Sequence, residues 1–419
     1  MDKIQINGGR RLQGEVQISG AKNAALPLIA SSILVNGTTV FNNVPHLMDI
    51  TSIRHLLESL GATCTFEDHV MTVDGSGINR IEADYDLVRK MRASILVLGP
   101  LVARFGHAKV SLPGGCAIGA RPVNIHLTGL EALGATINLD HGYIEARAEN
   151  GLHGNEIICE MPTVGGTENL MMAASLAKGT SVIRNAAREP EIVCLADALN
   201  AMGAKISGAG SSNIFIEGVE ELHPAEVSVI PDRIETGTFM VAAAATNGDV
   251  LIRGCNPDHL GAVIDQLTAT GALVEAWEDK IRVIGTGEIK SADIETLPYP
   301  GFPTDMQAQF MALMTVAKGE SVVHESIFEN RFIHANELTR MGADITVTGA
   351  KYAHVNGVEK LQGAPVMASD LRASASLVIA GLVAEGETTI SRVYHMDRGY
   401  ESIEKKFSAL GADVKRIKE

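Results

Sequence analysis

The stretch GLEALGATINLDHGYIEA, residues 129–146, decides the fold because it joins a helix pattern to a hairpin pattern. Apolar residues at helical spacing lead up to the Gly-Ala pair at Gly134 and Ala135, and alternating residues follow on both sides of a turn at His141 and Gly142. The stretch therefore predicts an amphipathic helix followed by a two-stranded β-hairpin.

This pattern occurs six times in the 419-residue chain. The other copies are LLESLGATCTF, ALNAMGAKISG, QLTATGALVEA, ELTRMGADITV and KFSALGADVKR, and the six glycines are Gly61, Gly134, Gly203, Gly271, Gly342 and Gly411, spaced 68 to 73 residues apart. An apolar run, a glycine and a strand-like segment recur 23 to 28 residues earlier, at Gly37, Gly106, Gly179, Gly248, Gly319 and Gly386. Two patterns held in register indicate an internal structural repeat.

Each repeat is predicted to contain an apolar helix capped by glycine, a strand, an amphipathic helix and a hairpin. The resulting order, βαβαββ, predicts an α/β fold of six repeat units. The first helix of each unit is apolar on nearly every side, so we expect it at the centre of a domain with the sheets outside it.

The two chain ends indicate how the units divide into domains. The sixth unit stops one strand short of its hairpin, whereas the chain opens with a lone strand, KIQING. If this strand completes the last unit, residues 1–21 and 230–419 form a discontinuous domain, and residues 22–229 form an inserted domain, with three units in each. The cleft between two such domains is the expected ligand site.

Composition excludes several classes of function. The net charge of -15 argues against a nucleic-acid or anionic-membrane surface, since both select basic patches. No apolar run predicts a secretory signal or a membrane span, and five cysteines without a CxxC pair are typical of free thiols in the cytoplasm. Because the chain has neither a zinc motif nor a dinucleotide GxGxxG motif, we expect no metal and no nucleotide cofactor.

Charged residues mark the starts of the six apolar helices. Three starts carry the expected acidic residue, Glu168, Glu235 or Asp305, and three carry a cation, Lys22, Arg92 or Arg372. A cation at a positive helix end favours an anion-binding site, because the side chain and the free amide groups can share one ligand. The alternative is a solvated or carboxylate-paired side chain.

Several longer motifs resemble the enolpyruvyl transferase family. They are GEVQISGAKNAALP, LPGGCAIGARPV, NAAREPEIV, PDRIETGTF, FPTDMQAQF, FENRF, DLRASASLV and HMDRGYE, and together they span essentially the whole chain. The resemblance implies a two-domain inside-out α/β barrel. It also implies transfer of the enolpyruvyl group of phosphoenolpyruvate to the 3'-hydroxyl of UDP-N-acetylglucosamine, with release of phosphate, in the first committed step of peptidoglycan precursor synthesis.

This chemistry needs a proton donor for C3 of phosphoenolpyruvate, a base for the sugar hydroxyl, and cations for the phosphate and carboxylate groups. The resemblance implies that phosphoenolpyruvate is bound by Lys22, Asn23, Arg92, Arg121, Arg372 and Arg398. It implies that Asn23 orients the sugar hydroxyl and that Asp305 is the general base, although an ordinary helix cap would also place an aspartate there. Asp370 either assists proton transfer or forms an ion pair with Arg372.

Cys116 lies in a glycine-rich loop that would act as a lid. The resemblance implies that its thiol is either the general acid toward C3 or a group needed for product release. Five further residues match family motifs and would shape the cleft: Glu189, Glu191, Asp232, Arg233 and Arg331.

The nucleotide sugar would contact residues of several segments. They are Arg92, Arg121, Pro122, Val123, Asn124, Thr163, Val164, Gly165, Asp305 and Ile327. Related chains often have aspartate, lysine and serine where this chain has Asn124, Met161 and Thr163. The missing lysine would weaken diphosphate binding, while backbone contacts would remain.

Two alternatives stay open at this point. A transferase that acts on shikimate 3-phosphate shares the fold and the phosphoenolpyruvate chemistry, but it matches the GGCAIGARP loop poorly. A non-catalytic repeat scaffold would leave the cations at the helix starts unexplained.

Overall fold

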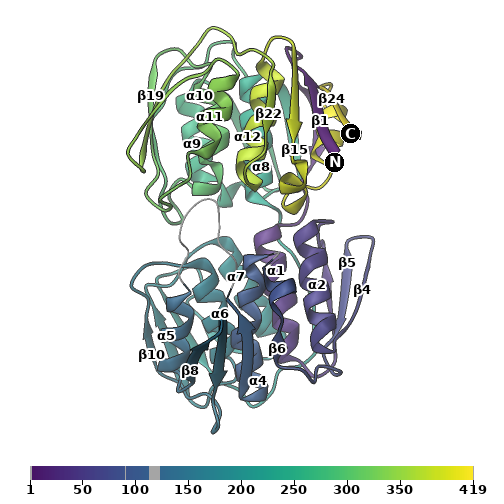
Figure 1. Cartoon of the computed structure of the whole chain (residues 1–419), viewed down its shortest axis with the longest axis vertical. Coiled ribbons are helices and arrows are strands. Elements are labelled where there is room, and N and C mark those ends of the chain that lie inside the picture. The colour runs from purple at the N-terminus through teal and green to yellow at the C-terminus, as the bar shows by residue number, and fades with distance from the viewer. Residues whose placement is uncertain (1, 90, 113–122, 419) are drawn as a thin grey trace. The chain divides into compact units, whose positions relative to one another are not determined.

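The computed structural model describes residues 2–89, 91–112 and 123–418, and these residues form two compact units (Figure 1). We call residues 20–112, without residue 90, and 123–230 the inserted unit. Residues 2–19 and 231–418, which include both described ends of the chain, are the terminal unit.

The inserted unit has three four-stranded sheets, with the strand orders β14-β3-β5-β4, β6-β7-β9-β8 and β10-β11-β13-β12. In each order the first two strands are parallel and the other neighbours are antiparallel. The strands are β3 (Thr38–Asn42), β4 (Thr63–Glu67), β5 (Val70–Asp74), β6 (Glu82–Ala83), β7 (His107–Ser111), β8 (Thr136–Asp140), β9 (Tyr143–Arg147), β10 (Glu156–Ile158), β11 (Thr180–Arg184), β12 (Lys205–Ser207), β13 (Asn213–Glu217) and β14 (Glu226–Ser228).

The terminal unit repeats this plan with the orders β16-β17-β15-β2, β18-β19-β21-β20 and β22-β23-β1-β24. The strands are β1 (Asp2–Asn7), β2 (Gln13–Gln17), β15 (Asp249–Arg253), β16 (Leu273–Trp277), β17 (Lys280–Ile284), β18 (Ile294–Glu295), β19 (Glu320–His324), β20 (Asp344–Thr348), β21 (Tyr352–Asn356), β22 (Pro365–Met367), β23 (Glu387–Ser391) and β24 (Asp413–Lys418). The N-terminal strand β1 pairs with β23 and β24 and thereby completes the sheet of the sixth repeat.

Three helices in each unit are buried along almost their whole length, as the apolar runs predict. These central helices are α1 (Lys22–Ser31), α4 (Leu98–Phe105), α6 (Val164–Ala174), α8 (Arg233–Ala245), α10 (Gln307–Met314) and α12 (Leu371–Val383). Short 3-10 segments precede two of them, η2 (Arg92–Val97) before α4 and η4 (Thr304–Met306) before α10. The predicted helix at Arg92 therefore begins as a 3-10 helix.

The remaining helices lie outside these central ones and have exposed residues on one side. They are α2 (Met48–Leu60), α3 (Tyr85–Val88), α5 (Asn124–Ala132), α7 (Pro190–Ala201), α9 (Gly261–Ala269), α11 (Ile333–Arg340) and α13 (Ile403–Ala409). Further 3-10 turns are η1 (Ser32–Leu34), η3 (Pro257–His259) and η5 (Val393–Arg398). In the described part of the chain, no helix combines the length and apolar character that crossing a membrane requires.

The six glycines of the repeat pattern have a common backbone conformation. Each follows an outer helix, and their φ angles lie between 91° and 109°. Only glycine adopts this region at little cost, since a Cβ atom is strained there. The second set of glycines does not have the predicted role, because only Gly106 caps its helix directly, whereas each of the six precedes a strand.

Within the described residues, the chain passes from one unit to the other at two places, each between a strand and a central helix. Strand β2 precedes α1 in sequence but pairs with β15 in the terminal unit, whereas β14 precedes α8 but pairs with β3 in the inserted unit. In the other four repeats, the short strand that precedes the central helix pairs with the strand that follows the same helix. The two crossings therefore exchange the short first strand between the units.

In the terminal unit, a buried carboxylate forms hydrogen bonds with a residue next to one of these crossings. Glu235 accepts hydrogen bonds from the Ser19 amide (2.7 Å) and from Lys406 Nζ (2.6 Å), and Lys406 also donates to Ser19 Oγ (2.8 Å). Burial raises the pKa of Glu235, and Lys406 opposes that rise. The ammonium group thus compensates a carboxylate that lies in an apolar surrounding.

Replacement of Gly342 by alanine tests the role of the repeat glycines. A Cβ atom there would meet no neighbour within 4 Å, so the only cost is the φ angle of 91°. We expect Gly342→Ala to lower the free energy of unfolding by about 1–2 kcal/mol in denaturant titration. The control is Gly261→Ala in the same unit, where the site is equally open and φ is ordinary. Equal stability of the two variants would contradict the argument.

Candidate functional site

The predicted site residues fall into two sets, one in each unit. The inserted unit contains Lys22, Asn23, Arg92, Val123, Asn124, Thr163, Val164 and Gly165. The terminal unit contains Asp305, Ile327, Asp370, Arg372 and Arg398. Cys116, Arg121 and Pro122 lie outside the described residues. Most members of both sets stand at the start of a central helix.

Lys22 is the first residue of α1 and is almost entirely buried. Its Nζ atom lies 2.9 Å from Oδ2 of Asp49, a buried residue in the first turn of α2. Asp49 was not singled out in the sequence, because an acidic residue in the first turn of a helix is common. An anionic substrate that binds Lys22 must therefore share the ammonium group with this carboxylate.

A buried polar group lies beside the predicted nucleotide segments. His126, in the first turn of α5, forms a 2.9 Å contact between its Nδ1 atom and Nδ2 of Asn169 in α6. Burial and the nearby Arg92 lower the pKa of His126 to about 4. Thr163 caps α6 through a long hydrogen bond from the Gly166 amide, 3.4 Å. Arg92, His126 and the start of α6 are thus parts of one region.

In the terminal unit, Asp305 is held between two guanidinium groups. Arg331 Nη2 donates to Oδ1 at 2.7 Å, and Arg372 Nε donates to Oδ2 at 3.1 Å. Both arginines are at most 5 % exposed, whereas the Asp305 side chain is 27 % exposed. Asp305 does not cap a helix as the alternative interpretation would have it; its carboxylate instead accepts from two guanidinium groups and remains partly exposed.

A second buried carboxylate positions this group. Glu325 accepts hydrogen bonds from Thr304 Oγ1 at 2.8 Å, from Thr296 Oγ1 at 2.9 Å, and from the amides of Ile327 and Phe328 at 3.0 Å each. Thr304 Oγ1 in turn accepts from Arg331 Nη1 at 2.8 Å. The hydrogen bonds therefore run from backbone amides through Glu325, Thr304 and Arg331 to Asp305.

Asp370 caps helix α12. Its Oδ1 atom accepts from the amides of Arg372 (2.8 Å) and Ala373 (2.9 Å), so it contacts the Arg372 backbone, whereas the Arg372 guanidinium contacts Asp305. The alternative of a simple Asp370–Arg372 ion pair is therefore not what these contacts show. Burial and Arg398 lower the pKa of His395, while Asp370 acts in the opposite direction, so these three groups lie near one another.

The acidic residues of the inserted unit include a fully buried one. Glu168 in α6 has a pKa well above its usual range, because of burial and of the negative charges of Glu191 and Glu189. Among the described residues, its Oε1 atom has no hydrogen-bond partner. Burial and the neighbouring carboxylates thus favour the protonated form of Glu168.

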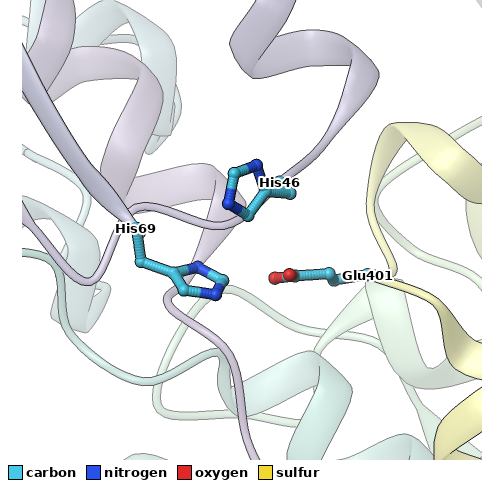
Figure 2. Close-up of side chains that lie close together, drawn as sticks. All are labelled: His46, His69 and Glu401. Carbon is cyan, nitrogen blue, oxygen red and sulfur yellow. The ribbon is translucent and has the colours of Figure 1, made fainter. Parts of the chain in front are cut away.

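Two exposed histidines of the inserted unit come together without any sequence signal (Figure 2). His46 precedes α2, and His69 lies in the turn between β4 and β5 with a φ of 64°. Their ring centroids are 4.6 Å apart and edge-on, and His46 also lies 4.4 Å from the Phe66 ring. Figure 2 also draws Glu401, which belongs to the terminal unit.

Comparison with known proteins identifies the family. The family model described as EPSP synthase (3-phosphoshikimate 1-carboxyvinyltransferase) matches residues 6–407. The chain belongs to the enolpyruvyl transferase family. It is 68 % identical over 418 residues to the UDP-N-acetylglucosamine 1-carboxyvinyltransferase of Desulforapulum autotrophicum and 62 % identical over 417 residues to that of Desulfosudis oleivorans, with full coverage of every chain.

Solved enolpyruvyl transferases share the fold. NikO from Streptomyces tendae has a TM-score of 0.89 at 26 % identity, with 99 % of each chain covered. EPSP synthase from Acinetobacter baumannii has a TM-score of 0.76 at 20 % identity with full coverage, which shows likeness of fold alone. The expected inside-out α/β architecture of six repeat units is thus confirmed.

Glu325→Gln tests the chain of hydrogen bonds to Asp305. The amide nitrogen of glutamine would face Thr304 Oγ1, which already accepts from Arg331, so the hydroxyl would lose its acceptor. We expect the free energy of unfolding to fall by about 1–3 kcal/mol in denaturant titration. Glu329→Gln, at an exposed position of the same loop, should leave it unchanged. A stable Glu325→Gln variant would show that the network does not constrain the site.

Proposed function

We propose that the protein transfers the enolpyruvyl group of phosphoenolpyruvate to the 3'-hydroxyl of UDP-N-acetylglucosamine and releases phosphate. The observation that carries this proposal is the 56–68 % identity, over the full length, to chains named UDP-N-acetylglucosamine 1-carboxyvinyltransferase. The match extends through both units, so it includes both sets of helix starts. We propose that residues of both sets take part in the reaction.

The reaction proceeds by addition and elimination. The sugar hydroxyl gives its proton to a base, its oxygen bonds to C2 of phosphoenolpyruvate, and C3 receives a proton. C3 then loses a proton, the bond between C2 and the phosphate oxygen breaks, and inorganic phosphate leaves. Negative charge on oxygen atoms changes in each step, so cations held in fixed positions stabilise the intermediate.

The terminal unit supports the role of base for Asp305. Arg331 and Arg372 form ion pairs with its carboxylate, and the exposed part of the side chain leaves room for a substrate hydroxyl. Arg372 also has a buried Nη1 atom without a hydrogen-bond partner in the described ranges. A buried donor without an acceptor is costly, and a substrate carboxylate or phosphate would supply the acceptor.

Residues of the inserted unit support binding of the other anionic groups of the proposed substrates. Lys22 and Asn23 begin α1, and Arg92 begins η2, so side chains and helix amides can act on the same anion. We propose that Lys22, Arg121 and Arg398 hold phosphoenolpyruvate, that Asn23 orients the sugar hydroxyl, and that Cys116 supplies the proton to C3 or assists product release. The nucleotide would lie against Asn124 and the start of α6.

We place the reaction in the cytoplasm, at the first committed step of peptidoglycan precursor synthesis. Four described cysteines, Cys64, Cys159, Cys194 and Cys255, are free thiols, which agrees with a reducing compartment.

The second substrate decides between this proposal and its nearest alternative. Purified protein with phosphoenolpyruvate should release phosphate when UDP-N-acetylglucosamine is added and not when shikimate 3-phosphate is added. Phosphate release with shikimate 3-phosphate alone would overturn the proposal. Mass spectrometry of the nucleotide product should show the added enolpyruvyl group.

Asp305→Asn tests the assignment of the base. Asparagine keeps the shape of the side chain but cannot accept the hydroxyl proton, so we expect kcat to fall by about 10²–10⁴. The matched control is Asp279→Asn, in the exposed turn between β16 and β17 of the same unit. If Asp305→Asn kept the turnover of the control, the base would have to be another residue.

A further inference from the structure

Each of the three central helices of the terminal unit contributes one buried polar side chain to a single cluster. The three side chains are those of Thr238 in α8, Gln309 in α10 and Arg372 in α12. The side chain of Tyr400, two residues after η5, lies among them, and no more than 3 % of any of the four residues is exposed. Because these groups are buried, they depend on one another for hydrogen bonds.

A backbone carbonyl fixes the orientation of the Gln309 amide group. Gln309 Nε2 lies 2.9 Å from the carbonyl oxygen of Asp305, and a carbonyl oxygen can only accept, so the atom that faces the cluster is the nitrogen. The same Nε2 atom lies 3.2 Å from Thr238 Oγ1 and 3.2 Å from the Tyr400 hydroxyl. Gln309 is therefore a donor toward both hydroxyl groups.

A second backbone carbonyl fixes the direction of the Thr238 hydroxyl. Thr238 Oγ1 donates its one proton to the Ile234 carbonyl at 2.8 Å. It can therefore only accept from the Tyr400 hydroxyl, which lies 2.9 Å away. Burial raises the pKa of Tyr400, and the positive charge of Arg372 opposes that rise, so the phenol keeps the proton that it donates. The lone pairs of the Tyr400 oxygen are then left for donors.

The Arg372 guanidinium lies beside this oxygen and can only donate. It forms a hydrogen bond with Tyr400, and its central carbon lies 5.3 Å from the centroid of the tyrosine ring. Arg372 Nε donates to Asp305 Oδ2 at 3.1 Å, whereas Nη1 is buried without a hydrogen-bond partner in the described part of the chain. A guanidinium is planar and rigid, so two fixed contacts also fix the direction of the remaining nitrogen atom.

From this geometry we propose that Tyr400 is a positioning residue for the transfer reaction: its hydroxyl accepts from the Arg372 guanidinium and thereby aims Nη1 at an anionic group of phosphoenolpyruvate, while Nε stays on Asp305. The inference rests on the proposed function and adds a residue that acts through Arg372. Tyr400 belongs to the motif HMDRGYE, but the sequence does not show that this tyrosine faces an arginine of another helix.

The alternative is that the cluster only holds the three central helices together. In that case loss of the Tyr400 hydroxyl would lower the stability of the protein and leave the kinetics of the folded enzyme unchanged. The experiments below therefore measure properties that stability alone does not alter.

Tyr400→Phe removes the hydroxyl and keeps the ring. In phosphate-release assays with saturating UDP-N-acetylglucosamine, we expect kcat/KM for phosphoenolpyruvate to fall about tenfold, as for one lost hydrogen bond to a charged group. Circular dichroism checks that the variant is folded at the assay temperature. The matched control is Tyr352→Phe, the same change at an exposed position of β21, which should behave as the unchanged protein. An unchanged kcat/KM in folded Tyr400→Phe would overturn the proposal.

A double-mutant cycle with Arg372→Lys shows whether Tyr400 acts through Arg372. Lysine keeps the positive charge but has no planar group that the phenol could orient. We therefore expect Tyr400→Phe to lower kcat/KM by no more than about twofold when it is added to Arg372→Lys. A further loss as large as in the unchanged background would show that Tyr400 acts on another group, and it would overturn the proposal.

Two variants of Thr238 test the direction of the hydroxyl bonds. Valine keeps the shape of the side chain but removes the acceptor of the Tyr400 proton, whereas serine keeps the hydroxyl. We expect Thr238→Val to lower kcat/KM about fivefold and Thr238→Ser to stay within about twofold of the unchanged protein. Equal losses in the two variants would indicate a packing effect and contradict the proposal. This pair also decides the question if Tyr400→Phe does not fold.

The orientation of Arg372 can also be followed without turnover. In ¹H–¹⁵N NMR spectra, the Nε–H signal of Arg372 is identified by its absence from Arg372→Lys. We expect this signal to shift in Tyr400→Phe and to keep its position in Tyr352→Phe. An unshifted signal in Tyr400→Phe would overturn the orienting role.

The spectra and the kinetics together distinguish two kinds of failure. If the unchanged protein transfers no enolpyruvyl group, the proposed function fails and the link between Tyr400 and the reaction fails with it, whereas the spectra still decide whether Tyr400 orients Arg372. If the unchanged protein is active and Tyr400→Phe matches it in both measurements, only this inference fails.

Discussion

A helix that is buried on every side can present polar groups only at its ends, and this constraint governs the whole chain. Three such helices fill the centre of each unit, and their side chains along the length are almost all apolar or fully covered. The sheets occupy the outside and leave the helix starts as the places where charges can gather. Lys22, Arg92, Asp305 and Arg372 all stand at or beside such starts.

Much of this architecture follows from the sequence because its causes are local. The repeat glycines can be recognised in the sequence, since a φ angle near 90° strongly disfavours other residues. The central helices can be recognised because they are apolar on every side and so have no side suited to solvent. The prediction of helix caps was wrong for five of the six glycines before the strands, because the sequence does not show that other residues lie between the helix end and the glycine. The strand exchange of β2 and β14 follows from the chain crossings, and no local pattern encodes it.

The residues of the candidate site are a prediction from the sequence, and the structure adds contacts that the sequence did not indicate. Motifs indicated Lys22, Asp305, Asp370 and Arg372, but not that Lys22 pairs with Asp49. Such partners come from distant segments and are ordinary residues in their own sequence surroundings. His126 follows the predicted nucleotide residue Asn124 by two positions, yet a buried histidine in a helix is a weak signal without its neighbours.

Internal carboxylates next to the cations that we propose as substrate ligands would have two opposite effects. Without substrate they keep buried cations such as Lys22 and Arg372 from being unpaired, which would cost several kcal/mol. With substrate they compete for the same cations, so part of the binding energy is offset. The Nη1 atom of Arg372 has no hydrogen-bond partner among the described residues, so the compensation by internal carboxylates is incomplete there. An incoming anion can therefore gain a contact without first breaking one.

In both units, these side chains are oriented by series of hydrogen bonds that begin at backbone amides. Asp305 is oriented by Arg331, Arg331 by Thr304, and Thr304 by Glu325, whose own carboxylate accepts from amides of the following turn. His126 is oriented by Asn169, which accepts from an amide of α4. A backbone N–H can only donate, and the fold fixes its position, so each series of hydrogen bonds has one direction. The direction of these bonds makes Nδ1 of His126 an acceptor and leaves Asp305 an acceptor as well.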